Sequence, residues 1–223
     1  MNRKQLLFGV VAIAAIAVLV AAYLLIFRNN SDDTTAAVAG GADMKLVSTD
    51  RHLGSPKAPI TLIEYAAPTC PHCSHFNETL FGQLKSSYID TGKVYYVFRV
   101  FPISQVDYAA EAMARCLPPD NYFQFIDLLF RNQSKWDPEY QVPDVHAALV
   151  QMGKIAGMSA EQVDKCIANQ SEQQRIAQVA QEAQTKFSVS STPTFIANGQ
   201  THVGGFEDFQ ALKDWLDPML KKS

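Results

Sequence analysis

The chain has 223 residues, 48% of them hydrophobic and 18% charged, and its formal net charge at pH 7 is −3. This length and composition fit one globular domain together with one further segment. The sequence has no block of basic residues, so nucleic acid is not an expected partner. It contains four cysteines. In an oxidising compartment four cysteines can form two pairs, which favours an exported protein.

The N-terminal region has the composition of a membrane anchor. Leu6 to Phe27 is an uncharged run of 22 residues, and about 20 are needed to cross a bilayer as a helix. Arg3 and Lys4 precede the run, and the chain soon becomes acidic after it. The positive-inside rule therefore predicts a cytoplasmic tip at residues 1–5, an anchor at 6–27 and an exported remainder.

Residues 28–44 are polar or small, a composition typical of a flexible tether. A cleaved signal peptide, cut at Ala37-Val38-Ala39, is the alternative to an uncleaved anchor. Signal peptides have apolar cores of roughly 7–15 residues, which is shorter than the core in this chain. Both interpretations export the domain that follows, which we place at residues 45–223.

The domain opens with strand signals. Lys45 to Val47 is predicted as a short strand, and Ile60 to Tyr65 as a central strand because its apolar character is nearly continuous. Glu64 interrupts that character. A carboxylate inside a buried strand is costly unless it is paired, hydrated or functional, so we interpret Glu64 as a proton acceptor or donor for the Cys73 thiol. The alternative is a residue at the rim of the strand that faces solvent.

The strand is followed by Cys70-Pro71-His72-Cys73, and then by apolar residues at helical spacing from Phe76 to Tyr88. Pro71 suits the first turn of a helix, because the N–H that it lacks would have no intrahelical partner there. Cys70 then lies at the helix start, where unpaired N–H groups and the helix dipole stabilise a thiolate. His72 adds a donor and, when protonated, a positive charge.

A dithiol at a helix start favours thiol–disulfide exchange. Because a stabilised thiolate leaves easily, the disulfide of Cys70 and Cys73 is readily passed to another protein, and the pair acts as an oxidant. Cys73, one turn further into the helix, is predicted to be less exposed and to resolve the mixed disulfide. This chemistry needs no metal or organic cofactor. Half of a zinc site, with His75 or His202, and a purely structural disulfide are the alternatives.

Val94 to Phe101 is predicted as a second strand, joined to the first by a right-handed crossover. From about residue 104 to residue 187 the apolar residues recur at helical spacing, so we expect a helical subdomain inserted between strands. Ser159 and Gln162 predict a capping box within that subdomain.

Cys116 and Cys166 fall inside the helical subdomain. We predict that they pair with each other, because Cys70 and Cys73 already form a local couple. A bridge that closes a 50-residue loop contributes roughly 4 kcal/mol in the chain-entropy model. Two separate buried thiols are the alternative, since free cysteine packs as a small hydrophobic residue.

Strand signals return near the C-terminus. Thr194 to Ala197 runs into Asn198-Gly199, a strong hairpin turn, and an amphipathic helix from Phe206 to Leu216 closes the domain. Thr192-Pro193 stands directly before the hairpin, and a proline at a strand start suits an edge or a tight bend. If its peptide bond is cis, the backbone polar groups of Thr192 are free to meet an incoming peptide.

These motifs resemble the DsbA family of thiol:disulfide oxidoreductases. The resemblance rests on the strand before Cys70, Cys-Pro-His-Cys at a helix start, the helical insertion, and Thr-Pro-Thr-Phe-Ile-Ala-Asn-Gly before a closing helix. It covers about Lys45 to the C-terminus and implies an α/β, thioredoxin-like fold with an inserted helical subdomain. It also implies that Cys70 is the attacking cysteine, that His72 stabilises its thiolate, and that Glu64 is the family's buried acid.

The resemblance further implies that Thr192-Pro193 is a cis-proline loop that contacts the substrate and the active-site sulfur. The best-known enteric members have Val in place of Thr192, whereas thioredoxin-like isomerases often have Thr, so the oxidising strength stays open. The resemblance also implies a quinone-linked membrane partner of DsbB type that reoxidises the pair.

We therefore expect a monomeric oxidase, anchored in the bacterial inner membrane, whose domain faces the periplasm or the cell exterior. It would donate the Cys70–Cys73 disulfide to newly exported, reduced proteins. A disulfide isomerase or reductase is the first alternative, although isomerases of this fold generally dimerise through an N-terminal domain that the short tether does not provide. A chaperone or zinc-binding module is the second.

Overall fold

The structure of the protein, a computed structural model, describes residues 46–221. The predicted cytoplasmic tip, anchor and tether lie outside the described residues, as does the alternative signal-peptide site. Among residues 46–221, no helix combines the length and the apolar character that a membrane crossing requires.

A mixed five-stranded sheet in the order β1-β3-β2-β4-β5 forms the centre of the described domain. Its strands are β1 (Arg51–Leu53), β2 (Ile60–Ala66), β3 (Val94–Val100), β4 (Thr194–Ala197) and β5 (Gln200–Val203). β2 and β3 are parallel, and the other neighbouring strands are antiparallel. Both central strands are buried throughout, as their apolar sequences predict.

Helices connect the strands. One helical stretch joins β2 to β3, formed by α2 (Pro71–Phe76), η1 (Asn77–Phe81), α3 (Gly82–Leu84) and η2 (Lys85–Ile89). The η1 and η2 segments are π-helical. The segment between β3 and β4 contains α4 (Gln105–Cys116), η3 (Pro119–Asn121), α5 (Tyr122–Arg131), α6 (Gln133–Trp136), η4 (Pro138–Tyr140), α7 (Val145–Ile155), α8 (Ala160–Ile167) and α9 (Gln170–Phe187). α10 (Phe209–Leu220) closes the chain.

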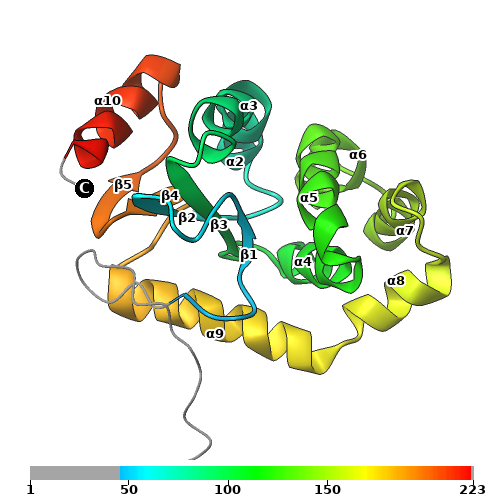
Figure 1. Cartoon of the computed structure of the whole chain (residues 1–223). Helices are drawn as coiled ribbons and strands as arrows, with labels where there is room; N and C mark the ends of the chain where they lie inside the picture. Colours follow the sequence, from blue (N-terminus) through cyan, green and yellow to red (C-terminus); the bar gives the residue numbers. More distant parts are fainter. Residues whose placement is uncertain (1–45, 222–223) are drawn as a thin grey trace, which may run out of the picture. The chain divides into compact units, whose positions relative to one another are not determined.

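Helices cover both faces of the sheet (Figure 1). α2, α3 and α10 lie over one face, α9 runs along the other, and α4 to α8 form a separate group beside the sheet. Alternate side chains of each strand point to opposite faces. Leu62 and Tyr96 therefore join the larger core cluster, whereas Ile63 and Val97 pack with Ala183 of α9 in a smaller one. This arrangement holds the start of α2 between the sheet and the helical insertion.

The first strand differs from the prediction. Leu46 and Val47 belong to no strand, and β1 lies at Arg51–Leu53, where it pairs antiparallel with β3. Leu46 packs against the smaller core cluster from a loop, so its apolar side chain reflects burial and not strand structure. β1 is a short, half-exposed edge strand, which is why Arg51 and His52 carry no apolar signal.

The closing helix also begins later than predicted. Its N-cap is Asp208, whose side chain accepts a hydrogen bond from the Ala211 N–H at 2.8 Å. Phe206 precedes the helix and is buried against Phe195, with ring centroids 5.2 Å apart. Its aromatic side chain thus fits the core without belonging to the helical repeat.

Candidate active site

The dithiol motif lies where β2 gives way to α2. Cys70 is the N-cap of the helix, with extended backbone angles of φ −74° and ψ 120°, and Pro71 is the first helical residue. Pro71 is tolerated there because the first N–H groups of a helix have no intrahelical partner. Pro71 and His72 are exposed, whereas Cys70 is 4% and Cys73 is 0% exposed, and both cysteines are free thiols. The motif therefore keeps one sulfur near the surface and buries the other.

The surroundings of Cys70 stabilise its thiolate. A hydrogen bond from Cys73 is the largest influence and lowers the pKa of Cys70 to about 6, against an ordinary 9.0. Burial opposes this shift, while the Thr192 side chain and the backbone N–H groups of Cys73 and His72 support it. These N–H groups belong to the first turn of α2, as expected at a helix start. With a pKa of about 6, roughly ten Cys70 thiolates exist for each thiol at pH 7.

Cys73 is shifted in the opposite direction. Burial raises its pKa well above the ordinary 9.0, and the hydrogen bond to Cys70 and the negative charges of Cys70 and Glu64 raise it further. A backbone hydrogen bond from Ala67 lowers it in part. Cys73 therefore keeps its proton while Cys70 is a thiolate, and only Cys70 combines nucleophilic character with access to the surface.

Glu64 is 2% exposed, so its interpretation as a solvent-facing rim residue is wrong. The Tyr96 hydroxyl donates a hydrogen bond to Glu64 Oε2 at 2.6 Å. Burial raises the pKa of Glu64 to about 8, against a lowering by the Tyr96 hydrogen bond, and the charge of Cys70 also raises it. The carboxyl group borders a small cavity that is also lined by Asn77, whose buried Oδ1 has no hydrogen-bond partner. A carboxyl with such a pKa exchanges its proton close to neutral pH.

The peptide bond between Thr192 and Pro193 is cis, and this loop contacts the motif. The Cys70 thiol donates a hydrogen bond to the Thr192 carbonyl oxygen, with 3.4 Å between sulfur and oxygen. That contact favours the thiol, whereas the Thr192 side chain favours the thiolate. Because the net shift of the Cys70 pKa is downward, the thiolate-stabilising contacts prevail. Pro193 is buried and Thr192 is half-buried, so Thr192 borders the surface beside the reactive sulfur.

This fold and site match known proteins. A family model described as thioredoxin covers residues 46–218. The chain belongs to the thioredoxin family. Among solved structures, the chain is similar to α-DsbA1 of Wolbachia pipientis, with a TM-score of 0.72 and 28% identity. The match covers 79% of this chain and 94% of that one. The DsbA-like, thioredoxin-type fold with a helical insertion, which the sequence predicts, is confirmed.

Two proteins with sequences similar to this chain are named for disulfide chemistry. A putative protein-disulfide oxidoreductase of Rickettsia bellii is 32% identical over 164 residues, which are 73% of this chain and 60% of that protein. A probable disulfide bond formation protein D of Bacillus cereus is 29% identical over 186 residues, which are 82% of this chain and 84% of that protein. The matched region thus spans 60% of the length of the rickettsial relative.

The histidines of the predicted site and of the zinc alternative have distinct surroundings. The backbone N–H of His72 reaches the Cys70 sulfur, and the residue itself is exposed. His75 is exposed at the end of α2, and His202 stacks on Phe206 with ring centroids 4.0 Å apart. In the part of the chain that the structure describes, no group of three or more His, Cys, Asp or Glu residues could hold a metal ion.

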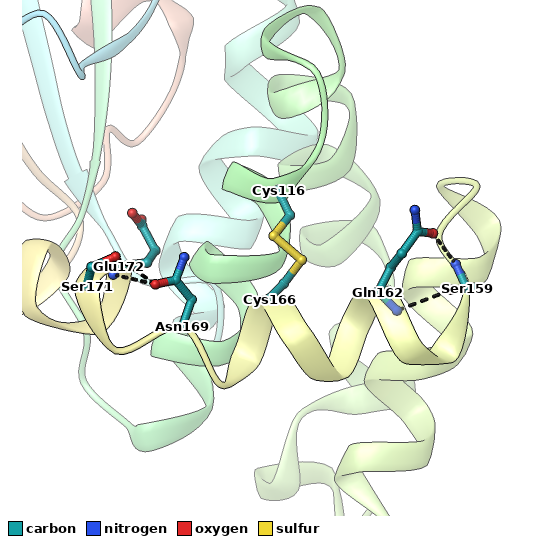
Figure 2. The surroundings of a disulfide bond; sticks show 7 residues. All are labelled: Cys116, Ser159, Gln162, Cys166, Asn169, Ser171 and Glu172. Atoms are coloured by element: carbon teal, nitrogen blue, oxygen red, sulfur yellow. Dashed lines mark hydrogen bonds between the residues drawn. A yellow bond between two sulfur atoms is a disulfide. The ribbon is translucent and has the colours of Figure 1, made fainter.

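A disulfide joins Cys116 and Cys166, with Cα atoms 6.0 Å apart (Figure 2). This is the pairing that the sequence predicts. Cys116 ends α4 and Cys166 lies in α8, so the bridge ties the first helix of the insertion to a later one. Figure 2 also shows the capping box at the start of α8, where Ser159 and Gln162 exchange hydrogen bonds of 2.7 and 3.2 Å.

The sequence alone did not identify three buried polar residues near the motif: Tyr96, Asp107 and Gln133. Tyr96 and Glu64 lie on adjacent parallel strands, and strand alternation could have placed them on the same face. Asp107 occupies the N3 position of a capping box that begins at Ser104, which is a recognisable pattern. Gln133 stands in a one-turn helix whose sequence offers no such signal.

Proposed function

We propose that this DsbA-like protein is a thiol–disulfide oxidase that donates the Cys70–Cys73 disulfide to reduced, newly exported proteins. The observation that carries the proposal is the opposite shift of two thiols in one motif, with the pKa of Cys70 at about 6 and that of Cys73 well above its ordinary value. A stabilised Cys70 thiolate favours the reduced pair, so the disulfide is the form that is given away. The names of the Rickettsia and Bacillus relatives, a protein-disulfide oxidoreductase and a disulfide bond formation protein, support thiol–disulfide chemistry at this site.

The size of this effect follows from the Cys70 pKa. At pH 7, a pKa of about 6 in place of 9.0 stabilises the reduced motif by about 1.4 kcal/mol. For a two-electron couple this corresponds to a potential about 30 mV higher. The lowered pKa therefore makes the pair more oxidising, and it accounts for one part of the driving force.

The exchange proceeds in two steps. A substrate thiolate attacks Cys70 Sγ of the motif disulfide, the bond between Cys70 and Cys73 breaks, and a mixed disulfide forms. A second substrate thiolate then attacks the substrate sulfur of that mixed disulfide and displaces Cys70 as a thiolate. The substrate has lost two electrons to form a disulfide, and the motif has gained them as a dithiol.

Glu64 supplies the proton that Cys73 needs when it leaves. With a pKa of about 8, the Glu64 carboxyl is mostly protonated at pH 7 and can protonate the buried sulfur. It interacts electrostatically with Cys73, and the Tyr96 hydroxyl holds Oε2. When the motif is oxidised again, the Cys73 proton returns by the same route.

Thr192 and His72 complete the proposed site. Because the Cys70 thiol contacts the Thr192 carbonyl oxygen, a substrate segment that approaches Cys70 also approaches the backbone of the cis-proline loop. We assign Thr192 and Pro193 to substrate binding on this ground. His72 is exposed, and its backbone N–H binds the Cys70 sulfur and favours the thiolate.

The cellular setting that we propose rests on the sequence. The uncharged run from Leu6 to Phe27 supports a single anchor in the bacterial inner membrane, with the domain outside the cytoplasm. The bridge between Cys116 and Cys166 suits an oxidising compartment. The DsbA likeness supports a quinone-linked DsbB-type reoxidase as partner and a monomeric state. Protease treatment of intact and of lysed spheroplasts tests the orientation: cleavage of the domain should occur before lysis.

Oxidation of a reduced, unfolded protein by the purified, oxidised full chain tests the activity. We expect stoichiometric loss of substrate thiols, no reaction with Cys70→Ser, and a trapped mixed disulfide with Cys73→Ser. The alternative is an isomerase or a reductase, since isomerases of this fold often have Thr at the position of Thr192. Such an enzyme, supplied as the dithiol, would instead rearrange or reduce a substrate with scrambled disulfides. Faster rearrangement than oxidation would reverse the assignment, and stoichiometric zinc in the purified protein would favour the zinc-binding module.

A further inference from the structure

We propose that Asp107 and Gln133, two side chains of the helical insertion, are positioning residues that fix the backbone of residues 68–70 and thereby the Cys70 sulfur. The inference rests on the proposed function, because it explains how the exchanging sulfur is held in place. Asp107 is fully buried and Gln133 is 5% exposed. Neither residue belongs to the motif, to its strand or to the cis-proline loop.

Asp107 binds the residue directly before the reactive cysteine. Its Oδ1 accepts a hydrogen bond from the Thr69 N–H at 2.9 Å, and its Oδ2 accepts one from the Thr69 hydroxyl at 3.1 Å. Oδ2 also accepts the N–H groups of Ile103 and Ser104, both at 2.9 Å. One carboxylate thus joins the loop that enters α2 to the loop that enters α4.

Gln133 holds the same loop from a second direction. Its Nε2 donates to the carbonyl oxygen of Pro68 at 2.7 Å and to that of Cys70 at 3.0 Å. The two carbonyls flank Thr69, so Asp107 and Gln133 together engage three consecutive residues. A primary amide has two N–H groups and can serve both carbonyls at once.

Other contacts complete the restraint of this loop. The Cys70 N–H donates to the Ala67 carbonyl oxygen at 3.0 Å, and the Ser74 N–H donates to that of Cys70 at 3.1 Å. The Ser74 hydroxyl reaches the Phe130 carbonyl oxygen of α5 at 3.0 Å. The insertion therefore touches the motif at its entrance, through Asp107 and Gln133, and within its first turn.

The position of the Cys70 backbone decides which groups reach its sulfur. Hydrogen bonds have steep distance and angle limits, and the sulfur depends on Cys73, on Thr192 and on the first N–H groups of α2. Without the Gln133 amide, the buried carbonyl oxygens of Pro68 and Cys70 would each lose a hydrogen-bond donor. Because an unsatisfied buried carbonyl is costly, the loop would rearrange to find other donors. The sulfur would then lose part of the environment that favours its thiolate.

The test replaces Gln133 by methionine, which has nearly the same shape but no N–H groups. In the reduced full chain, the pKa of Cys70 is measured from the pH dependence of its alkylation by iodoacetamide. We expect Q133M to lower the thiolate-to-thiol ratio at pH 7 by about tenfold, which is a rise of about one pH unit in the pKa. Thr69→Val, which removes only the hydroxyl bound to Asp107, should lower the ratio by about threefold.

Asn132 offers a matched control. Its side-chain amide donates to the Leu128 carbonyl oxygen at 2.8 Å, one residue away from Gln133 but with no hydrogen bond to residues 68–70. N132L should lower the unfolding midpoint and leave the Cys70 pKa at the wild-type value. If Q133M and T69V also lower the midpoint while both keep the wild-type pKa, the two residues stabilise the fold only, and the proposal is overturned.

The T69V variant and the substrate-free assay allow a conclusion even if one part of the experiment fails. If Q133M does not fold, T69V decides, because it retains the Thr69 backbone hydrogen bond to Asp107 and changes one hydroxyl. The alkylation assay uses no protein substrate, so it remains informative if the wild-type protein fails to oxidise substrates. In that case the proposed function fails, while the effect of Gln133 on the Cys70 pKa is still measured.

Discussion

Replacing Glu64 by glutamine is expected to stabilise the folded protein at neutral pH. The Glu64 carboxyl has a pKa of about 8 in the folded chain, against an ordinary 4.5. At pH 7 the folded state therefore holds a proton that the unfolded state releases. This difference lowers the free energy of unfolding by about 1.4 kcal/mol per pH unit between 4.5 and 7, or by about 3 kcal/mol in total. Glutamine keeps an acceptor for the Tyr96 hydroxyl and has no such proton.

The sign of the pH dependence follows from the direction of each shift. Because the pKa of Glu64 is raised, its contribution is most favourable below pH 4.5 and becomes less favourable up to about pH 8. The lowered pKa of Cys70 acts oppositely in the reduced protein: it adds stability above about pH 6, fully so above 9.0. Comparison of E64Q with wild type removes most of the Cys70 contribution, because both proteins contain that thiol.

Urea unfolding of the reduced full chain at about pH 4, 7 and 8.5 measures this difference. The gain from E64Q should be close to zero at the lowest pH and about 3 kcal/mol at pH 7. Glu111 is a matched control, since it is also buried but accepts hydrogen bonds from Arg115 at 2.7 Å and Arg175 at 2.8 Å. E111Q should destabilise by roughly 3 kcal/mol. An E64Q protein no more stable than wild type at pH 7 would refute the account of a buried carboxyl whose pKa is raised in the folded state.

Further predictions concern the four cysteines. Iodoacetamide should modify Cys70 with a rate that rises through a pKa of about 6; a midpoint near 9 contradicts thiolate stabilisation. Cys73 should resist modification in the native protein, because it is buried and its pKa is raised, and rapid modification would show that it is accessible. Replacing Cys116 and Cys166 together by alanine should lower the free energy of unfolding by roughly 4 kcal/mol, without moving the Cys70 midpoint. An unchanged free energy would argue against a stabilising bridge.

Local sequence signals were sufficient for the motif and for most of the sheet. Pro71 after Cys70 predicts a helix start by its own chemistry, and the structure begins α2 there. The apolar run from Ile60 predicts a central strand, and β2 is buried throughout. Such features depend on a few neighbouring residues and can be inferred without knowing the tertiary contacts.

Features that depend on tertiary contacts were not predictable in the same way. β1 is defined by its pairing with β3, and its residues have no strand pattern of their own. Phe206 has helical spacing but packs against Phe195 before the helix begins. The Gln133 amide donates a hydrogen bond to the Cys70 carbonyl oxygen, and the two residues are 63 positions apart in the sequence. No local sequence pattern predicts such a contact. The sequence singled out Glu64 as a carboxylate in an apolar strand, but only the structure shows that it is buried and that Tyr96 binds it.

The equilibrium reduction potential of the Cys70–Cys73 pair, titrated against glutathione, tests the central claim most directly. The stabilised Cys70 thiolate predicts a potential well above that of the glutathione couple, so that the disulfide is the less stable form. A potential near that of thioredoxin, about −270 mV, would contradict the oxidase assignment. The same site would then serve a reductase.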